Sequence, residues 1–485
     1  MTKKKLIAFL LTASYVAAAF IIGCIPEDSL QWSADGSKGI YSKKGALFLV
    51  DGGTGALTQI AAKETTTIWP VISPDGSQFA YGQIVKVDNF NNALNLLPLA
   101  QAKEIEAHAE ILKQKILNDG IKDANLPSLD GSLNEQHTAW VDRYLIEKAD
   151  NQLAQKIGPE LIKKTREKEL PFYRLVLAST AEPNDKKILA SSSRQLWRQR
   201  FSPDSKLIAW VIDNISGKMF DAGFDLYVSA CDRKTPPALV ASAIAVSYDF
   251  RPDSRAIAYL KPEDENFKDQ KLVLGSLVER TLIDANGKLL VSLDQGSPKS
   301  YTCTGSAKEF AGVLYNCWMK VLYARDGRIF FSSTKMSLPS SKIDTEKGSV
   351  FCCDTLTGSV SDILPQIALD FTQGNFYLFE LSHDSRKMLL PGNKNTLGIY
   401  AMGPDIESSK ILVDANESFS DDSPPKLVPQ WKGPDQVSCL VSEESHYLTA
   451  DPNTPHRRKE IVILDAKGNL VQILSKDWPD ELLDF

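Results

Sequence analysis

This sequence has few histidines and no excess of positive charge. It has 5 histidines, and its 55 lysines and arginines are outnumbered by 61 aspartates and glutamates, which gives a net charge of -6. A surface that binds nucleic acid needs a clustered excess of cations, so we expect no nucleic-acid partner. No cysteine or histidine spacing indicates zinc, and we expect no metal and no cofactor. The histidines are scattered, at His108, His137, His383, His446 and His456.

The motifs of several large enzyme classes are also absent. The sequence contains no P-loop, no G-x-G-x-x-G fingerprint and no G-x-S-x-G elbow. Nucleotide chemistry and serine hydrolysis of the α/β-hydrolase kind are therefore not indicated. We predict a protein that is not an enzyme and has no catalytic residue. A metal-dependent enzyme is the alternative, because His446 and His456 share one loop.

Long apolar runs are confined to the N-terminus. Lys3, Lys4 and Lys5 precede an uncharged stretch over 6–22, which ends at Gly23 and Cys24. This order is typical of an export signal. The run is shorter than the roughly 20 residues of a membrane-spanning helix. An uncleaved anchor in which Cys24 is incidental is the alternative.

The end of this run resembles the bacterial lipobox, with Ile21, Ile22, Gly23 and Cys24 in order. The resemblance implies a lipoprotein signal peptide over 1–23 and lipid attachment at Cys24. Acyl chains would then hold the protein on a membrane, since each buried methylene contributes about 0.8 kcal/mol. The expected location is the bacterial cell envelope, either at the outer membrane facing the periplasm or at the cell surface.

Cysteines are few, and an exported chain permits disulfides. Of the 7 cysteines, Cys303 and Cys317 bracket one long connection and are the best candidates for a bridge. Buried free thiols are the alternative.

A four-residue turn recurs along the rest of the chain. The pattern is Ser-Pro-Asp-Gly with substitutions, and aspartate is third in every copy. Proline presets the second position, aspartate bonds its own backbone and glycine accepts the left-handed conformation, so the pattern predicts a tight turn. Serine or glutamine in place of glycine should weaken individual turns. The copies lie at 33–36, 73–76, 202–205, 251–254, 324–327, 382–385 and 433–436.

Each turn is flanked by short apolar runs rich in β-formers, and two further strand-like runs follow it. Four strands per repeat is the signature of a propeller blade. We therefore predict an all-β fold, a seven-bladed β-propeller, with six blades as the alternative if the last unit is incomplete. A calcium-binding ring is the alternative role for the repeated aspartates, but their regular place in every turn favours a structural role.

These repeats resemble those of the periplasmic TolB family, in which SPDG joins two apolar strands. The resemblance covers nearly all of the chain after Cys24 apart from one insertion, and it implies a propeller over 24–485. TolB proteins carry a further domain before the propeller, whereas the first turn here follows soon after Cys24. The resemblance therefore does not extend to TolB's own role.

The insertion, over 88–171, separates the second and third turns and is expected to be helical. Ile105, Ala109, Leu112 and Ile116 recur on one helical face. We expect these faces to pack on one another or on the second blade, with partner binding as the alternative. Because strands alternate in direction, the insertion and most other long connections should gather on one face of the ring, where binding is usual.

These features predict a lipid-anchored, non-enzymatic scaffold of the cell envelope that binds a protein or a glycan. The alternative is a propeller enzyme acting on a polysaccharide, because oligogalacturonate lyases resemble this repeat pattern and use a histidine-rich metal site. Convergent histidine, glutamine and arginine in the central channel would favour the enzyme. An apolar or mixed channel would favour binding.

Overall fold

The computed structural model describes residues 29–87, 170–192, 195–213, 223–232, 237–262, 273–290, 298–301, 314–315, 319–337, 342–363, 369–370, 379–391, 396–401, 408–412, 429–441 and 460–483. The predicted lipidation site Cys24 and the predicted disulfide between Cys303 and Cys317 lie outside these ranges. The predicted helices of the insertion do so as well.

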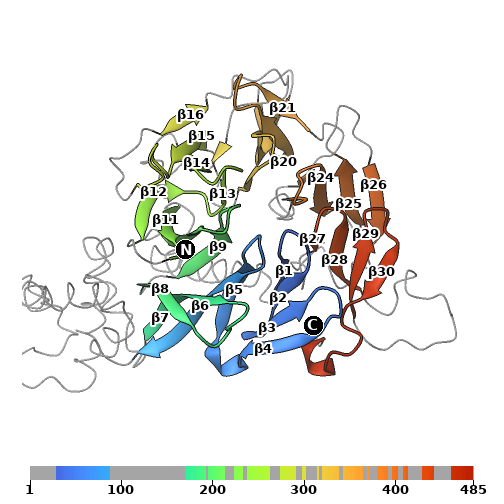
Figure 1. Cartoon of the computed structure of the whole chain (residues 1–485). Coiled ribbons are helices and arrows are strands. Elements are labelled where there is room, and N and C mark those ends of the chain that lie inside the picture. Colours follow the sequence, from blue (N-terminus) through green and yellow to red (C-terminus); the bar gives the residue numbers. More distant parts are fainter. Residues whose placement is uncertain are drawn as a thin grey trace, which may run out of the picture.

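The described residues form antiparallel sheets arranged around a ring (Figure 1). The first sheet contains β1 (Ser29–Trp32), β2 (Lys38–Lys43), β3 (Ala46–Asp51) and β4 (Leu57–Ala61). The second contains β5 (Thr67–Ile72), β6 (Gln78–Val87), β7 (Leu170–Ser179) and β8 (Lys187–Ser192). The third contains β9 (Leu196–Phe201), β10 (Leu207–Asp213), β11 (Phe224–Ala230) and β12 (Ala238–Ile244).

The second half of the chain continues the same arrangement. The fourth sheet contains β13 (Tyr248–Phe250), β14 (Ala256–Pro262), β15 (Val273–Thr281) and β16 (Lys299–Tyr301), with β17 (Leu314–Tyr315) also on β15. The fifth contains β18 (Val321–Tyr323), β19 (Ile329–Ser337), β20 (Lys342–Cys353) and β21 (Val360–Asp362), with β22 (Leu369–Asp370) on β20. The sixth contains β23 (Glu380–Leu381), β24 (Lys387–Pro391), β25 (Thr396–Ala401) and β26 (Ser408–Leu412). The last contains β27 (Gln430–Lys432), β28 (Gln436–Val441), β29 (Glu460–Asp465) and β30 (Leu470–Ile473).

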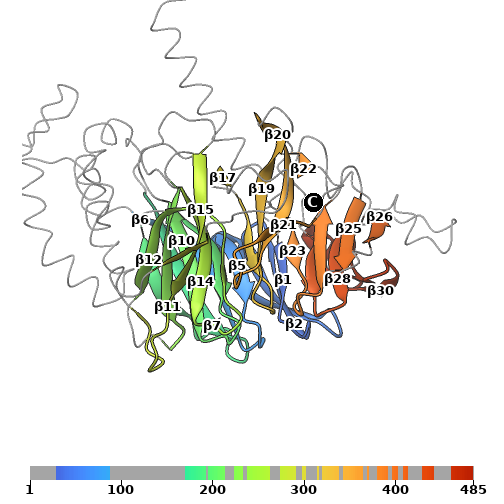
Figure 2. The ribbon, with the colours of Figure 1, turned by 90° about the horizontal axis from the view of Figure 1, so that it is seen from above.

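The prediction of an all-β propeller is confirmed. Each of the predicted turns joins the first and second strands of one sheet, and the first strand lies nearest the centre of the ring (Figure 1). The described residues form seven separate sheets, and the last one has its full set of four strands. Their helical part consists of two short 3-10 helices, η1 (Lys63–Thr65) and η3 (Asp480–Leu482). Viewed from above, the strands run side by side across the thickness of the ring (Figure 2).

The repeated aspartates bind their own turns. In the second sheet the Ser73 hydroxyl donates to Asp75 Oδ1 at 2.6 Å, and the Ser77 backbone N–H donates to the same oxygen at 2.9 Å. Burial opposes ionisation of Asp75, but these donors prevail and lower its pKa. The aspartate oxygens therefore support the turns, as the structural reading predicts.

Serine at the fourth turn position makes a hydrogen bond that the sequence did not suggest. Ser205, Ser254 and Ser385 adopt φ values of 61°, 61° and 57°, a conformation that favours glycine. Their hydroxyls, however, accept backbone N–H groups from the turn of the preceding sheet. Asp204 N donates to Ser254 Oγ at 3.1 Å, for example. The substitutions that were expected to weaken single turns therefore connect neighbouring sheets.

The core lies between adjacent sheets rather than within one of them. In β10 every residue over 207–212 is buried, so this strand has no solvent-facing side. The same holds over 329–333 in β19. A middle strand buried on both faces needs a largely apolar run rather than an alternating one, because a sheet lies on each side of it. Ser332 and Ser333 are the polar residues buried in the second of these stretches.

The insertion begins and ends at paired strands. β6 and β7 pair without interruption up to Val87 opposite Leu170. Leu170 and Pro171, which were assigned to the insertion, therefore belong to β7, because Pro171 pairs with Lys86 at the end of the ladder. Residues 88–169 leave the second sheet at a connection between its second and third strands, as predicted.

The C-terminal segment lies across the seam between the first and last sheets. Neither sheet takes a strand from the other end of the chain, so side chains must join them. Trp478 Nε1 donates to Gly55 O at 2.7 Å, and the Tyr41 hydroxyl donates to Leu482 O at the same distance. The tail therefore joins the two ends of the ring.

Candidate functional site

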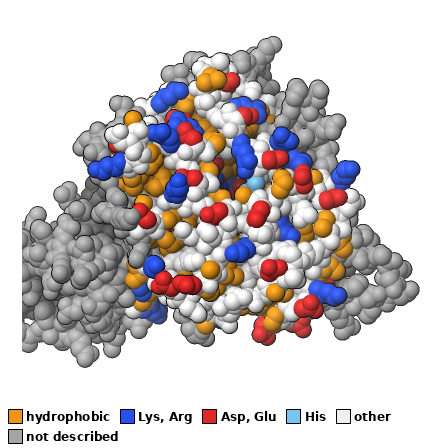
Figure 3. Space-filling view, in the orientation of Figure 1, with side chains coloured by type: hydrophobic (Ala, Val, Ile, Leu, Met, Phe, Trp, Pro, Cys, Tyr) orange, Lys and Arg blue, Asp and Glu red, His pale blue; other side chains and the backbone are white. Residues whose placement is uncertain are grey.

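A cavity of about 1200 Å³ occupies the centre of the ring. Its wall is built by the innermost strands, and every sheet contributes to it. Figure 3 shows that charged side chains of both signs are interspersed on the face of the ring seen in Figure 1. The cavity thus lies inside a surface of mixed charge. The polar or aromatic side chains from successive sheets include Gln31, Trp69, Arg200, Asp249, Lys320, Glu380 and Gln430.

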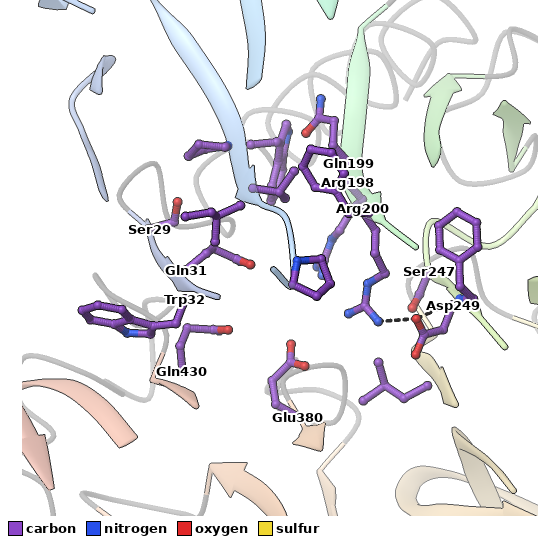
Figure 4. A pocket seen from close by; sticks show the side chains of 18 of the residues that line it. Ser29, Gln31, Trp32, Arg198, Gln199, Arg200, Ser247, Asp249, Glu380 and Gln430 are labelled. Carbon is purple, nitrogen blue, oxygen red and sulfur yellow. Dashed lines mark hydrogen bonds and ion pairs between the residues drawn. The ribbon is translucent and has the colours of Figure 1, made fainter. Parts of the chain in front are cut away.

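Arg200 and Asp249 form an ion pair across two sheets. Arg200 Nη1 lies 2.5 Å from Asp249 Oδ1 (Figure 4). The other carboxylate oxygen accepts the backbone N–H of Tyr323, in the next sheet, at 2.8 Å. Burial nevertheless raises the pKa of Asp249, although Arg200 opposes the rise. One carboxylate therefore ties three consecutive sheets together at the cavity wall.

Lys320 and Glu380 form a second ion pair, between the fifth and sixth sheets. The Lys320 side chain is only 5% exposed, and burial lowers its pKa despite the adjacent carboxylate. Burial acts to raise the pKa of Glu380, but Lys320 and Arg200 outweigh it and hold that pKa below its usual value. Arg198 adds to this lowering, so one carboxylate serves three cations.

Two inner strands bulge at the same level of the wall. In β5 the register shifts between Ile68 and Val71, and in β9 the shift opposes Arg198 and Gln199 to one residue of β10. Trp69 and Arg198 occupy equivalent positions in these bulges, with φ values of 51° and 46°. Bulges re-aim side chains and strained residues cluster at functional sites.

The bulges bring aromatic and cationic groups together. The Arg198 guanidinium lies over the Trp69 ring, 5.5 Å from its centroid. The Trp69 and Trp197 rings are 5.7 Å apart and tilted. A stacked arginine keeps its charge and its outward donors while its flat face is covered. This corner of the cavity therefore presents a fixed positive charge beside indole surface.

Two amide side chains face the open centre. Gln31 and Gln430 come from the first and last sheets and extend toward the middle of the cavity in Figure 4. Within the described part of the chain, neither side chain has a hydrogen bond or ion pair. A carboxamide can donate and accept at once. These two groups are thus available to a bound molecule.

The histidines of the sequence point to one residue of the described cavity wall. His383, the one histidine within the described ranges, is partly buried at the cavity wall, and burial and Arg325 lower its pKa. His108, His137, His446 and His456 lie outside the described residues. Those residues contain no group of three histidine, cysteine or acidic side chains arranged to hold a metal. The wall carries His383, glutamines and arginines beside apolar side chains, so it meets both of the criteria stated above, the one for an enzyme and the one for binding.

The cavity residues were missed, yet the sequence carries a signal for them. Gln31, Arg200, Asp249 and Glu380 each stand two places before the turn motif of their sheet. That place lies in a short apolar strand, where a buried side chain should be hydrophobic. A polar residue recurring there indicates a wall that faces a cavity.

The similarity of this chain to known proteins is to solved structures. No protein-family model and no curated protein matches it. Solved structures include TolB from Acinetobacter baumannii, at 14% identity and a TM-score of 0.36. That match covers 61% of this chain and 58% of TolB, so the chain spans less than two thirds of the length of that protein. The likeness concerns the fold alone.

Two further solved structures show similar resemblance. Hydrazine synthase from Kuenenia stuttgartiensis is 12% identical, with 78% of this chain and 77% of that chain covered and a TM-score of 0.38. An oligogalacturonate lyase in complex with manganese is 11% identical, with coverages of 74% and 71% and a TM-score of 0.38. Among the described residues, no helix has the length and apolar character needed to cross a membrane.

Proposed function

We propose that this protein is a lipid-anchored binding protein of the bacterial cell envelope, which holds part of a protein or a glycan in its central cavity. The observation that carries the proposal is the cavity wall, where every sheet contributes a lining side chain and two amides have no side-chain partner among the residues that the structure describes. Ligand sites combine a concave wall with a few convergent polar groups. The described wall offers charges and amides for recognition.

Filling the cavity should abolish binding. Replacing Gln430 with tryptophan places an indole where an amide faces the centre, so ligand should be excluded sterically. The full-length tagged protein, solubilised in detergent, would be incubated with envelope extract, and the molecules it retains quantified by mass spectrometry. We expect the Gln430→Trp variant to lose the species that wild type retains.

The matched control is Gln59→Trp, on the exposed outer strand β4 of the first sheet. It introduces the same side chain away from the cavity and should retain ligand as wild type does. Equal retention by all three proteins would refute binding in the cavity. Recovery of shortened glycan, rather than intact ligand, would instead support the alternative of an enzyme that acts on polysaccharide.

The membrane anchor has an independent test. Cys24→Ala should leave an unprocessed precursor that takes up no fatty-acid analogue, because the thiol is the acylated group. The control is Cys231→Ala, which removes a half-buried thiol in the third sheet and should leave labelling unchanged. Normal processing and labelling of Cys24→Ala would exclude the anchor while leaving the cavity proposal untouched.

A further inference from the structure

The innermost strand of the first sheet fixes the side from which the chain enters the ring. β1 begins at Ser29, which pairs with Ser42 of β2, and the two hydroxyl oxygens lie 3.2 Å apart. Leu30 is buried, so the strand is held from its first residues. Because β1 runs from Ser29 to the turn over 33–36, the chain enters from the side opposite the repeated turns. We call the side marked by Ser29 the entry face and the other side the turn face.

The central cavity reaches both of these faces. Its lining includes Lys44, in the hairpin between β2 and β3, and Thr66, just before β5, both of which lie on the entry face. It also includes Pro74 and Asp75 of the second turn and Pro203 of the third, which lie on the turn face. The cavity therefore extends through the thickness of the ring, and a ligand could reach it from either side.

The distance between the predicted lipidation site and β1 limits how the ring can face a membrane. Cys24 stands five positions before Ser29, and a fully extended chain of that length spans at most about 18 Å. If the turn face lay on the membrane, this linker would have to reverse direction at Ser29. It would then run back past the four residues of β1, about 13 Å, and past the turn that follows them.

The bilayer adds to the length that the linker would need. Acyl chains on Cys24 enter the hydrocarbon core only after the chain has crossed the headgroup layer, which is roughly 6 Å thick. The strand, the turn and the headgroup layer together exceed the reach of the linker. On the entry face no reversal is needed, because the chain already leaves Ser29 in the direction away from the turns.

We propose that the entry face is held against a phospholipid surface by the acylated Cys24, and that the cavity opens to the aqueous compartment through the turn face. A dissolved ligand then enters the cavity past the repeated turns, rather than past residues 88–169, which leave the second sheet on the entry face. This inference rests on the lipid anchor of the proposed function and adds the orientation of the ring.

Fluorescence quenching on vesicles tests the orientation. A fluorescent non-natural amino acid replaces either Lys63 or Lys206, so both substitutions remove the same charge. Lys63 is exposed in η1, on the entry face, and Lys206 follows the third turn with its side chain 81% exposed. The acylated full-length protein is added to preformed vesicles of phosphatidylethanolamine and phosphatidylglycerol. We expect a quencher on the lipid headgroups to act several-fold more strongly at position 63, and iodide in solution to act more strongly at position 206.

A longer linker isolates the role of the tether. About thirty Gly/Ser residues inserted after Pro26 have an end-to-end distance of roughly 30 Å, which frees the ring to turn. We expect this variant to float with the vesicles and the difference between the two positions to fall towards zero. The control carries the same insert after the exposed Glu182, in the connection between β7 and β8, and should keep the difference. A difference that survives the longer linker would overturn the tether as its cause.

Flotation of the vesicles separates failure of the anchor from failure of the orientation. Protein that does not float with the vesicles would show that the anchor is absent, and this inference would fail together with that part of the proposed function. Protein that floats but is quenched by the lipid equally at both positions, or more strongly at position 206, would overturn the orientation alone.

Discussion

Replacing Trp478 with alanine should lower the free energy of unfolding by about 3–5 kcal/mol, the range for truncating a buried tryptophan. Trp478 is 4% exposed and belongs to the apolar cluster shared by the first and last sheets. Its ring lies 5.0 Å from that of Tyr41, and its indole N–H is bonded to Gly55. The substitution removes packing and leaves Gly55 O without this donor.

The effect should reach the whole ring because side chains, and not a shared strand, join this seam. A propeller whose first and last sheets exchange a strand has backbone hydrogen bonds there. In this protein the first sheet ends with β4 and the last with β30, each built from its own end of the chain. Across the seam, Trp32 Nε1 donates to Ser438 Oγ at 3.0 Å, Lys432 Nζ to Gly52 O at 2.7 Å and Gln472 Nε2 to Gly53 O at 3.1 Å, in addition to the bonds of the tail. Loss of the packing of the tail should therefore make the ring unfold at a lower concentration of denaturant.

Urea unfolding followed by far-ultraviolet circular dichroism measures this effect. Asp477→Ala changes the exposed neighbour of Trp478 and should lie within about 0.5 kcal/mol of wild type. Tyr41→Phe deletes only the hydroxyl that bonds Leu482 O and should cost about 1 kcal/mol. If Trp478→Ala unfolds at the same urea concentration as Asp477→Ala, the tail does not stabilise the ring and other contacts hold the seam.

The propeller could be predicted because its determinants are local. Each turn is specified by four adjacent residues, as Ser73, Asp75 and Ser77 show, and the flanking strands follow from apolar runs. What the turn pattern did not reveal was the hydroxyl of Ser254, which bonds a turn of the preceding sheet, because that partner is set by the packing of one sheet on the next.

The cavity was less predictable for the same physical reason. Lys320 and Glu380 meet only when the fifth and sixth sheets pack side by side, and nothing in their spacing indicates a pair. The bulges at Trp69 and Arg198 oppose local preference, since neither residue favours a positive φ. Tertiary packing imposes both. Sequence reasoning reached the scaffold and the candidate Cys24, whereas the binding wall needed the arrangement of the sheets.

Removing Glu380 should destabilise the protein more than removing its partner Lys320. Glu380→Gln leaves the Lys320 ammonium enclosed beside Arg198 and Arg200, with no carboxylate in direct contact. Loss of one member of a buried ion pair costs about 3–5 kcal/mol. Lys320→Met leaves Glu380 with two arginines that still attract it, so its cost should be clearly smaller.

The double variant Lys320→Met/Glu380→Leu should return close to wild-type stability, because replacing a whole buried pair with apolar side chains is often neutral. The control pair is Lys187 and Asp185, 3.0 Å apart with side chains 45% and 56% exposed. Asp185→Asn should change the free energy of unfolding by no more than about 1 kcal/mol, since solvent screens that pair. Equal costs for Glu380→Gln and Lys320→Met would show that the two charges balance only each other. A larger cost for Glu380→Gln would show directly that this one carboxylate restrains more than one cation.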